Sequence, residues 1–407
     1  MTEAGPLSGM RVLDLGWVWS GPLVATILGE LGADVIKVEH GRRLDSTRMR
    51  GRPLRDGKPV EGPSIELSPM FHQTNHGKRS VTLNLKDERA CALVRRLVAV
   101  SDVVVENLSP GALDRAGLGY DRLKACNPGI VMCSMSAAGQ YGPLADMRAY
   151  APVMSSFVGL EALIGYPGGE PLGAMNVGIG DPNAATHALV AILHALDARA
   201  TTGEGVYIDL SQIECLAMTM AGPFLEAALG GPQPAIPGNR RPDAAPHGFF
   251  PCAGDDRWVS IAVFTDDEWR SLAAAAGIDD ERFATMAGRK AAEDALEAVV
   301  ARWTHGQDRD ALVSRLRAAG IAASPVLSLE EQWEDPHLAA RRVRVPVTHP
   351  LYGGELLYTA PWRMSETPPR IERSSPLLGE HNEEVLSGLL GLTAAEIAEL
   401  KAADVVS

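Results

Sequence analysis

Short apolar runs alternate with helical segments along the first half of the chain, and this alternation limits the possible folds most strongly. Residues 10–15 (MRVLDL) and 34–39 (DVIKVE) read as buried strands, with a helical stretch from Pro22 to Gly32 between them. The same reading applies to four later runs, 78–86, 102–106, 130–135 and 206–210. Strands separated by helices pair in parallel. We therefore expect an α/β fold with a doubly wound, parallel sheet whose ligands bind beyond the carboxyl ends of the strands.

The chain divides into three expected parts. Its 407 residues are enough for two or three domains at roughly 100–200 residues each. A stretch rich in Gly and Pro, 230–246, reads as a linker, and a hairpin signal follows at 248–263. Thr265 and Glu268 form a capping-box pattern before a helix. We expect a large domain over residues 1–225, a smaller α/β domain over 226–330, and a segment 331–407 that returns to the large domain.

Composition excludes several classes of protein. The formal charge of −13 argues against a nucleic-acid partner. Five scattered cysteines without CxxC spacing favour neither a disulfide framework nor a zinc site, and the histidines lack metal-ligand spacing. No apolar run reaches about 18 residues, and the N-terminus does not resemble a signal peptide. We expect a cytoplasmic protein without a metal or a membrane partner.

Residues 177–196 (VGIGDPNAATHALVAILHAL) contain the most informative polar residue. Asp181 precedes Pro182, which suits the first position of a helix, so Asp181 is expected at the N-cap or one residue from it. The helix dipole favours its ionised form there. Such an aspartate is commonly a structural cap, but it can also be a covalent nucleophile if it faces a cleft. Local sequence does not choose between the two.

Residues 41–69 read as one long polar loop with six arginines, Arg42, Arg43, Arg48, Arg50, Arg52 and Arg55. A loop of this length in a compact domain is usually functional or mobile. Two interpretations stay open for its arginines, a solvated surface or a face that binds phosphate.

Several standard sites are excluded by their motifs. The chain has no GxxxxGK[ST], GxSxG or HExxH sequence. A dinucleotide site is a weak alternative, since Glu39 lies where a ribose ligand would be expected after the first turn. That turn, however, reads GWVWSG instead of GxGxxG, and its tryptophans would hinder a pyrophosphate.

Seven stretches in a fixed order carry a resemblance that covers nearly the whole chain. They are LSGMRVLDLGWVWSGP, LGADVIKVEH, KRSVTLNLK, SDVVVENLSPGALDRAGLGY, GDPNAATHALVAILHAL, TGEGVYIDLS and LLGEHNEEVL. Together they resemble the class III, or formyl-CoA transferase-like (CaiB/BaiF), coenzyme A transferases, a family that also includes α-methylacyl-CoA racemases.

The resemblance implies a fold, an assembly and a set of site residues. It implies a Rossmann-like large domain made from both chain ends, an inserted smaller domain, and a ring-shaped chain interlocked with a second copy in a homodimer. It implies Asp181 as the catalytic nucleophile. The implied contacts to coenzyme A are Val18, Trp19, Ser20, His40, Leu83, Lys86, Asn107, Leu108, Arg115 and Arg148. Lys86, Arg115 and Arg148 are the strongest candidates, because the phosphates of CoA need cations.

The implied reaction moves CoA from an acyl-CoA to a carboxylic acid through a covalent aspartyl intermediate, with CoA as substrate and no permanently bound cofactor. Backbone N–H groups near Gly178 and Gly180 are candidate oxyanion donors.

Two departures bear on the substrate. Oxalate-type members have a glutamine where this chain has Trp19, and their glycine-rich loop has no clear counterpart here. Both argue for an acid other than oxalate. Two alternatives stay open, a racemase and a CoA-binding protein without activity. The histidine that a racemase uses as an acid or base would align near Tyr150, and a tyrosine is a poor substitute for it.

Overall fold

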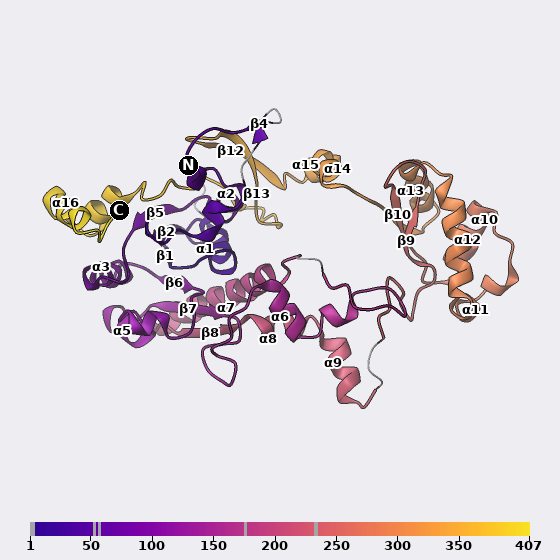
Figure 1. The fold of residues 1–407 in the computed structure, drawn as a ribbon, viewed down its shortest axis with the longest axis horizontal. Coiled ribbons are helices and arrows are strands. Elements are labelled where there is room, and N and C mark those ends of the chain that lie inside the picture. Colours follow the sequence, from indigo (N-terminus) through magenta and orange to yellow (C-terminus); the bar gives the residue numbers. More distant parts are fainter. Residues whose placement is uncertain (1–4, 52–53, 56–57, 175–176, 232–234) are drawn as a thin grey trace. The chain divides into compact units, whose positions relative to one another are not determined.

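The computed structural model describes residues 5–51, 54–55, 58–174, 177–231 and 235–407 (Figure 1). The chain forms two compact units. The larger unit comprises Met1–Leu160, Ala174–Gly230 and Arg342–Ser407, and the smaller comprises Glu161–Gly173 and Gly231–Arg341. The structure therefore places one boundary after Arg341 and adds Glu161–Gly173 to the smaller unit, where the sequence suggested a boundary at residue 330 and a continuous insertion.

The larger unit is built on a six-stranded, fully parallel sheet in the order β5-β2-β1-β6-β7-β8. This is the order of a doubly wound Rossmann-like sheet, so the expected α/β class and parallel sheet are confirmed. The order reverses between β1 and β6, which makes that edge the expected ligand site. The strands are β1 (Arg11–Asp14), β2 (Asp34–Glu39), β5 (Arg79–Thr82), β6 (Val103–Glu106), β7 (Val131–Ser136) and β8 (Tyr207–Ser211).

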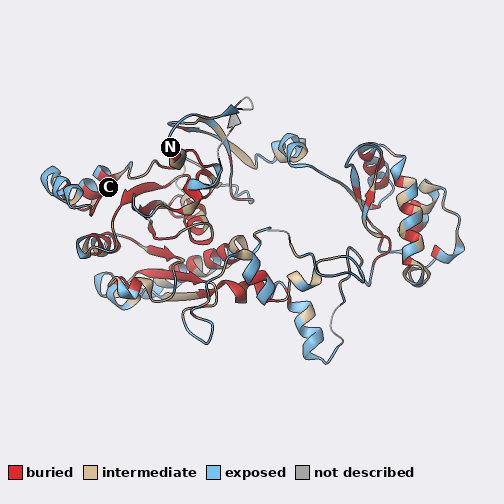
Figure 2. Cartoon of the chain, viewed as in Figure 1, coloured by how far each residue is buried: buried red, intermediate tan, exposed pale blue. Residues whose placement is uncertain are grey.

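Helices cover both faces of this sheet because alternate strand residues are apolar on both sides. Val12, Val35 and Val105 pack with α1 (Ser20–Glu30) and α7 (Gly180–Thr202) on one face. Leu13, Ile36 and Val104 pack on the other face with α3 (Glu88–Val98) and with C-terminal residues such as Val385 and Val406. Figure 2 shows the buried residues concentrated in the strands and on the helix sides that face them.

The remaining elements of the larger unit are mostly short. They are α2 (Pro69–Asn75), α4 (Ala112–Arg115), α5 (Tyr120–Cys126), α6 (Ala151–Phe157), α8 (Gln212–Met218), α9 (Ala221–Ala228), α16 (Ala394–Ala402), the π-helical turn η5 (Glu384–Leu389) and the antiparallel pair β12 (Arg344–His349) and β13 (Gly353–Tyr358).

Residues 41–69 are not one long loop, as the sequence suggested. They contain two 3-10 helices, η1 (Ser46–Met49) and η2 (Ser64–Glu66), and a short pair, β3 (Leu54–Arg55) with β4 (Lys58–Pro59). Arg48 is fully buried and pairs with Glu39 at 2.8 Å and with Glu66 at 2.7 Å. Neither proposed role for the arginines, solvation or phosphate binding, fits Arg48, because both ends of its guanidinium are held by carboxylates.

The smaller unit contains the predicted hairpin. β9 (His247–Pro251) and β10 (Trp258–Ala262) pair antiparallel, and β11 (Ala322–Val326) adds to β10. The predicted capping box is present, with Thr265 and Glu268 at the start of α10. Its helices are η3 (Glu161–Leu163), α10 (Asp266–Ala276), η4 (Glu281–Phe283), α11 (Met286–Ala291), α12 (Glu293–His305), α13 (Arg309–Ala318), α14 (Leu329–Glu334) and α15 (Pro336–Ala340).

The described residues contain no group of three His, Cys, Asp or Glu side chains placed to hold a metal ion. Within the same residues, no helix combines the length and apolar character needed to cross a membrane.

Candidate active site

The turn after β1 occupies the switch point of the sheet. It leads from β1 into α1, and Asn107, which follows β6, lies beside it. The Asn107 side chain accepts the Trp17 N–H at 2.7 Å and donates to the Trp17 carbonyl at 2.7 Å. It also donates to the Ser20 hydroxyl at 3.0 Å. These bonds let α1 begin at Ser20, two residues before the start predicted at Pro22.

Asp181 is not the cap of its helix. α7 begins at Gly180 after Ile179, and no side chain among the described residues caps it, so Asp181 is the second helical residue and Pro182 the third. The Asp181 carboxylate interacts with the hydroxyl and the backbone N–H of Ser20 and with its own backbone N–H, and all three lower its pKa. Ser20 is the first residue of α1, so the positive ends of two helices meet at one carboxylate.

The environment of Asp181 pulls its pKa in opposite directions. Burial raises the pKa, whereas the Ser20 hydroxyl, the Ser20 N–H and the charge of Arg50 lower it. Burial dominates, and the pKa of Asp181 lies above its ordinary value. The helix dipole was expected to favour the ionised form, and desolvation opposes that effect and has the larger influence on the pKa.

Trp19 lies directly against the loop that precedes Asp181. A Cβ added to Gly178 would stand 2.7 Å from Cζ3 of the Trp19 ring, which is closer than side-chain carbon atoms approach each other. The missing side chain at Gly178 therefore makes room for the Trp19 indole. At Gly180, two residues further along, an added Cβ would lie 3.3 Å from the end of the Met154 side chain.

A cavity of about 210 Å³ lies beyond the carboxyl ends of β1, β2 and β5. It brings together four of the predicted CoA contacts, His40, Leu83, Lys86 and Leu108. Its wall mixes apolar side chains with cations, and the remaining lining residues are Leu15, Trp17, Val38, Glu39, Arg42, Arg43, Asn84 and Leu85. The Arg43 guanidinium lies over the Trp17 ring at 4.3 Å. An apolar floor with basic groups at the rim suits an adenine with attached phosphates.

Six of the ten predicted contacts do not line this cavity: Val18, Trp19, Ser20 and Asn107 lie in or beside the turn after β1, and Arg115 and Arg148 lie elsewhere. Arg115 is exposed at the end of α4, and Arg148 is exposed between β7 and α6. Tyr150, the position considered for a racemase base, is exposed and precedes α6.

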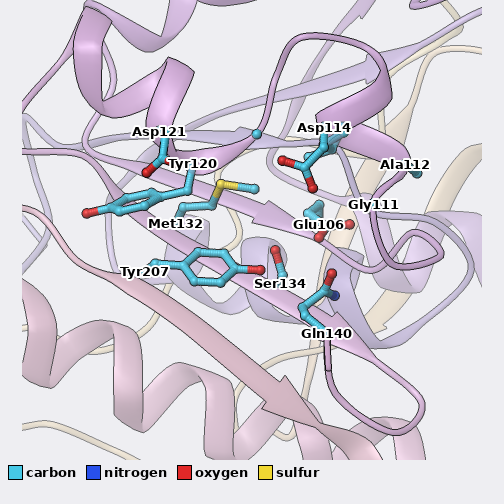
Figure 3. Close-up of a pocket in the computed structure, with 12 residues that line it drawn as sticks. Glu106, Gly111, Ala112, Asp114, Tyr120, Asp121, Met132, Ser134, Gln140 and Tyr207 are labelled. Atoms are coloured by element: carbon cyan, nitrogen blue, oxygen red, sulfur yellow. The ribbon is translucent and has the colours of Figure 1, made fainter. Parts of the chain in front are cut away.

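A second cavity, of about 230 Å³, lies beside α4 and is acidic (Figure 3). Glu106, Asp114 and Asp121 contribute carboxylates, and Tyr120 and Tyr207 stack with ring centroids 5.3 Å apart. Burial raises the pKa of Glu106. Carboxylates repel phosphate, so this cavity is poorly suited to CoA, in contrast to the first cavity.

Glu39 cannot serve as the ribose ligand of a dinucleotide site as the side chains stand. Both of its oxygens accept hydrogen bonds from Arg48, at 2.9 and 2.8 Å.

Sequence reasoning also missed three residues around the turn, Lys37, Asp45 and Gln212. Lys37 lies in the quoted stretch LGADVIKVEH without being a predicted contact, whereas Asp45 and Gln212 lie outside the quoted stretches, and each residue reaches the turn from a separate part of the chain.

Comparison with known proteins places this chain in a family. The model of CoA-transferase family III matches residues 7–382, and the chain belongs to that family. It is 35% identical to the succinate–glutarate CoA-transferase of Agrobacterium fabrum over 94% of this chain and 96% of the relative. It is 34% identical to the succinyl-CoA–D-citramalate CoA-transferase of Chloroflexus aurantiacus, over 98% of each chain.

A solved structure supports the same assignment. A CaiB/BaiF family protein from Brucella suis is similar with a TM-score of 0.85 and 33% identity, covering 95% of this chain and all of the other. The protein is thus a class III CoA-transferase, as the resemblance implied.

Proposed function

We propose that this enzyme moves CoA between an acyl-CoA and a carboxylic acid through covalent bonds to Asp181. One observation carries the proposal: a half-buried carboxylate meets two donors from the first residue of α1, and Trp17 of the same turn lines a cavity that suits CoA. A purely structural aspartate at a helix start would interact with its own helix alone, whereas Asp181 also interacts with Ser20 of a different helix.

The proposed reaction has four steps. The Asp181 carboxylate attacks the thioester carbonyl, which forms a mixed anhydride and releases the CoA thiolate. The thiolate then attacks the aspartyl carbonyl, which gives an aspartyl-CoA thioester and frees the donor acid. The acceptor carboxylate attacks this thioester, and a second anhydride forms with release of thiolate. Thiolate attack on the acceptor carbonyl yields the new acyl-CoA and regenerates Asp181. Covalent catalysis divides one difficult exchange into easier steps.

The residues around Asp181 have separate proposed roles. Ser20 orients the carboxylate, and the backbone N–H groups near Gly178 and Gly180 are candidate oxyanion donors. Trp19 covers the loop and shapes the acyl site. The chemistry needs no metal or redox group, because every step is an acyl transfer between oxygen and sulfur.

We propose that CoA occupies the cavity lined by His40, Leu83, Lys86 and Leu108. Lys86, Arg42 and Arg43 would meet its phosphates, and the predicted contacts Val18, Trp19, Ser20 and Asn107 would border the thioester end near Asp181. Arg115 and Arg148 remain proposed contacts, and both are exposed.

The acids exchanged are proposed to be dicarboxylic. The names of the two relatives contain succinate, glutarate, succinyl-CoA and citramalate. Arg50 supports dicarboxylic substrates for this chain as well, because its side chain is exposed and its charge lowers the pKa of Asp181. Its guanidinium contacts the Met70 sulfur at 4.0 Å. Among the described residues, no carboxylate forms a salt bridge with it. A cation in this position can pair with the second carboxylate of the substrate.

We also propose a homodimer, as the family resemblance implies. α9 supports an interface, since none of its residues is buried in the isolated chain although its sequence, AGPFLEAA, is mostly apolar. Phe224, Leu225 and the following Leu229 are 48%, 61% and 79% exposed. An exposed apolar helix is typical of a surface that a partner covers.

Trapping the covalent intermediate tests the mechanism. Incubation with succinyl-CoA and hydroxylamine should convert Asp181 to its hydroxamate, detected by peptide mass spectrometry. Asp181→Asn should abolish both transfer and trapping, whereas Asp197→Asn, on an exposed face of the same helix, should retain both. An unmodified Asp181 in an enzyme that turns over would contradict the covalent scheme. Exchange of the α-proton without an acceptor acid would support the racemase alternative.

A further inference from the structure

We propose that Asp45 is a positioning residue, which holds the turn after β1 in the conformation that places the two Ser20 donors on Asp181. The inference rests on the proposed role of Asp181 and adds a residue outside the family motifs quoted above. It starts from an unusual backbone conformation at Val18.

Val18 adopts a left-handed backbone conformation, with φ of 64°. Its β-branched side chain disfavours this region strongly, and such a residue keeps the conformation only where its surroundings hold it there. Ser20 lies two residues further along, so relaxation of Val18 to a negative φ would rotate the chain that enters α1. The hydroxyl and N–H of Ser20 would then leave the Asp181 carboxylate.

The group that holds Val18 is the carboxylate of Asp45. Both oxygens of Asp45 accept the Val18 N–H, each at 3.2 Å. The carboxylate is itself fixed, because Oδ1 accepts the Thr47 N–H at 2.9 Å and the Thr47 hydroxyl at 2.8 Å. Asp45 is 2% exposed, so water cannot easily replace these bonds.

Lys37 joins Asp45 to the other end of the turn. Its Nζ lies 3.5 Å from the Asp45 carboxylate and donates to the Gly16 carbonyl at 2.9 Å. The neighbouring Asp14 accepts the Gly16 N–H at 2.8 Å. Three successive residues of the turn are thus held by different elements: Gly16 by β1 and β2, Trp17 by Asn107 after β6, and Val18 by Asp45. Asp45 is the last of these restraints before Ser20.

The Asp45 carboxylate stays ionised over the pH range in which Asp181 titrates. Burial alone would raise its pKa, but Lys37, Thr47 and Val18 more than compensate, and the pKa of Asp45 is lowered. The restraint therefore stays in place while Asp181 titrates.

The experiment measures the protonation of Asp181 in Asp45→Asn. The variant keeps the shape of the side chain but turns an N–H₂ group toward Lys37 or Val18, so the turn is released. Loss of the Ser20 donors raises the pKa of Asp181. The charge of Arg50 still acts on Asp181 in this variant and lowers the pKa as before. The acid limb of the kcat/KM profile should move up by about one pH unit, and kcat/KM should fall by about tenfold to a hundredfold.

A second readout does not need turnover. Carbodiimide labelling of Asp181, followed by peptide mass spectrometry across pH, reports the same protonation and should shift with the kinetic profile. Failure of the proposed function would leave this labelling shift intact, so the two failures are distinguishable. Asp280→Asn, which removes a comparable cap from η4 in the smaller unit, should shift neither readout.

Val18→Gly separates positioning of the turn from a general loss of structure. Glycine adopts a φ of 64° without strain, so the turn of this variant has less need of Asp45. The loss caused by Asp45→Asn should be at least about threefold smaller in the Val18→Gly background than in the wild type. The proposal is overturned if folded Asp45→Asn keeps the wild-type labelling midpoint, or if its loss is equal in both backgrounds.

Discussion

The ring of Trp19 occupies the space into which a side chain at Gly178 would project. The ideal Cβ position of Gly178 lies 2.7 Å from Cζ3 of Trp19. Trp19 precedes α1, and Gly178 lies three residues before Asp181, so this contact joins the loop before the proposed nucleophile to the turn after β1.

Gly178→Ala should damage catalysis more than stability. The new methyl group must displace Trp19 or the loop, and a misplacement of about 1 Å near a reacting group can cost about a hundredfold in rate. We expect kcat/KM to fall at least about tenfold, measured with the best acyl-CoA and acid pair. Gly306→Ala, where an added Cβ meets open space, is the matched control and should match the wild type. Unchanged kinetics in Gly178→Ala would mean that Trp19 does not shape the acyl site.

Ser20→Ala should shift the pH dependence of the enzyme. Asp181 must be ionised to attack, so activity falls as the pH drops through its pKa, which burial already raises. Removing the hydroxyl donor destabilises the anion and raises that pKa further, by about one unit for one bond to a charged group. The acid limb of kcat/KM should move to higher pH. Ser314→Ala, which removes an exposed serine of α13, serves as the control. A limb that stays in place would show that the hydroxyl does not support the carboxylate.

Asp181→Asn should stabilise the fold at neutral pH while it abolishes transfer. The folded-state pKa of Asp181 is raised, so this group favours folding at low pH, and that contribution is lost as pH rises through the folded pKa. Asparagine does not titrate and lacks the cost of a buried charge. The Tm difference between variant and wild type should therefore increase from acid to neutral pH, as measured by thermal unfolding. A constant difference would indicate that Asp181 is not desolvated in solution.

Arg50→Gln should reduce the preference for dicarboxylic acids. Removing the cation weakens pairing with the second carboxylate, and a hydrogen bond to a charged group contributes about 1.5–3 kcal/mol. KM for succinate should rise at least about tenfold, whereas KM for butyrate should change less than about threefold. Arg270→Gln, on the exposed surface of α10, is the charge-matched control. Equal effects on both acids would assign Arg50 a role other than selection of dicarboxylates.

Lys86→Ala should weaken binding of CoA esters with little effect on the chemical step. Lys86 lines the proposed CoA cavity and is exposed to solvent, so we expect KM for the acyl-CoA to rise by about threefold to tenfold with kcat within about twofold. Lys124→Ala, which removes a surface lysine of α5, should leave both constants unchanged. A fall in kcat at constant KM would place Lys86 in catalysis instead.

The sequence by itself determined the parallel sheet, most of its strands and the helix that carries Asp181. These follow from local patterns, since apolar runs and helical periodicity specify elements without knowledge of their neighbours. The strand Asp34–Glu39 and the capping box at Thr265 illustrate how well such local signals predict structure.

Only the tertiary structure decided what the polar residues do. Arg48 and Arg50 lie in one short segment, yet Arg48 is buried between two glutamates, and Arg50 is exposed and acts on Asp181. The Asp181 carboxylate bonds to Ser20 on another helix, and the turn beside it depends on partners 27 and 90 residues away along the chain. The physical reason is that a buried polar group takes whichever partner folding brings within reach, and sequence separation does not reveal that partner.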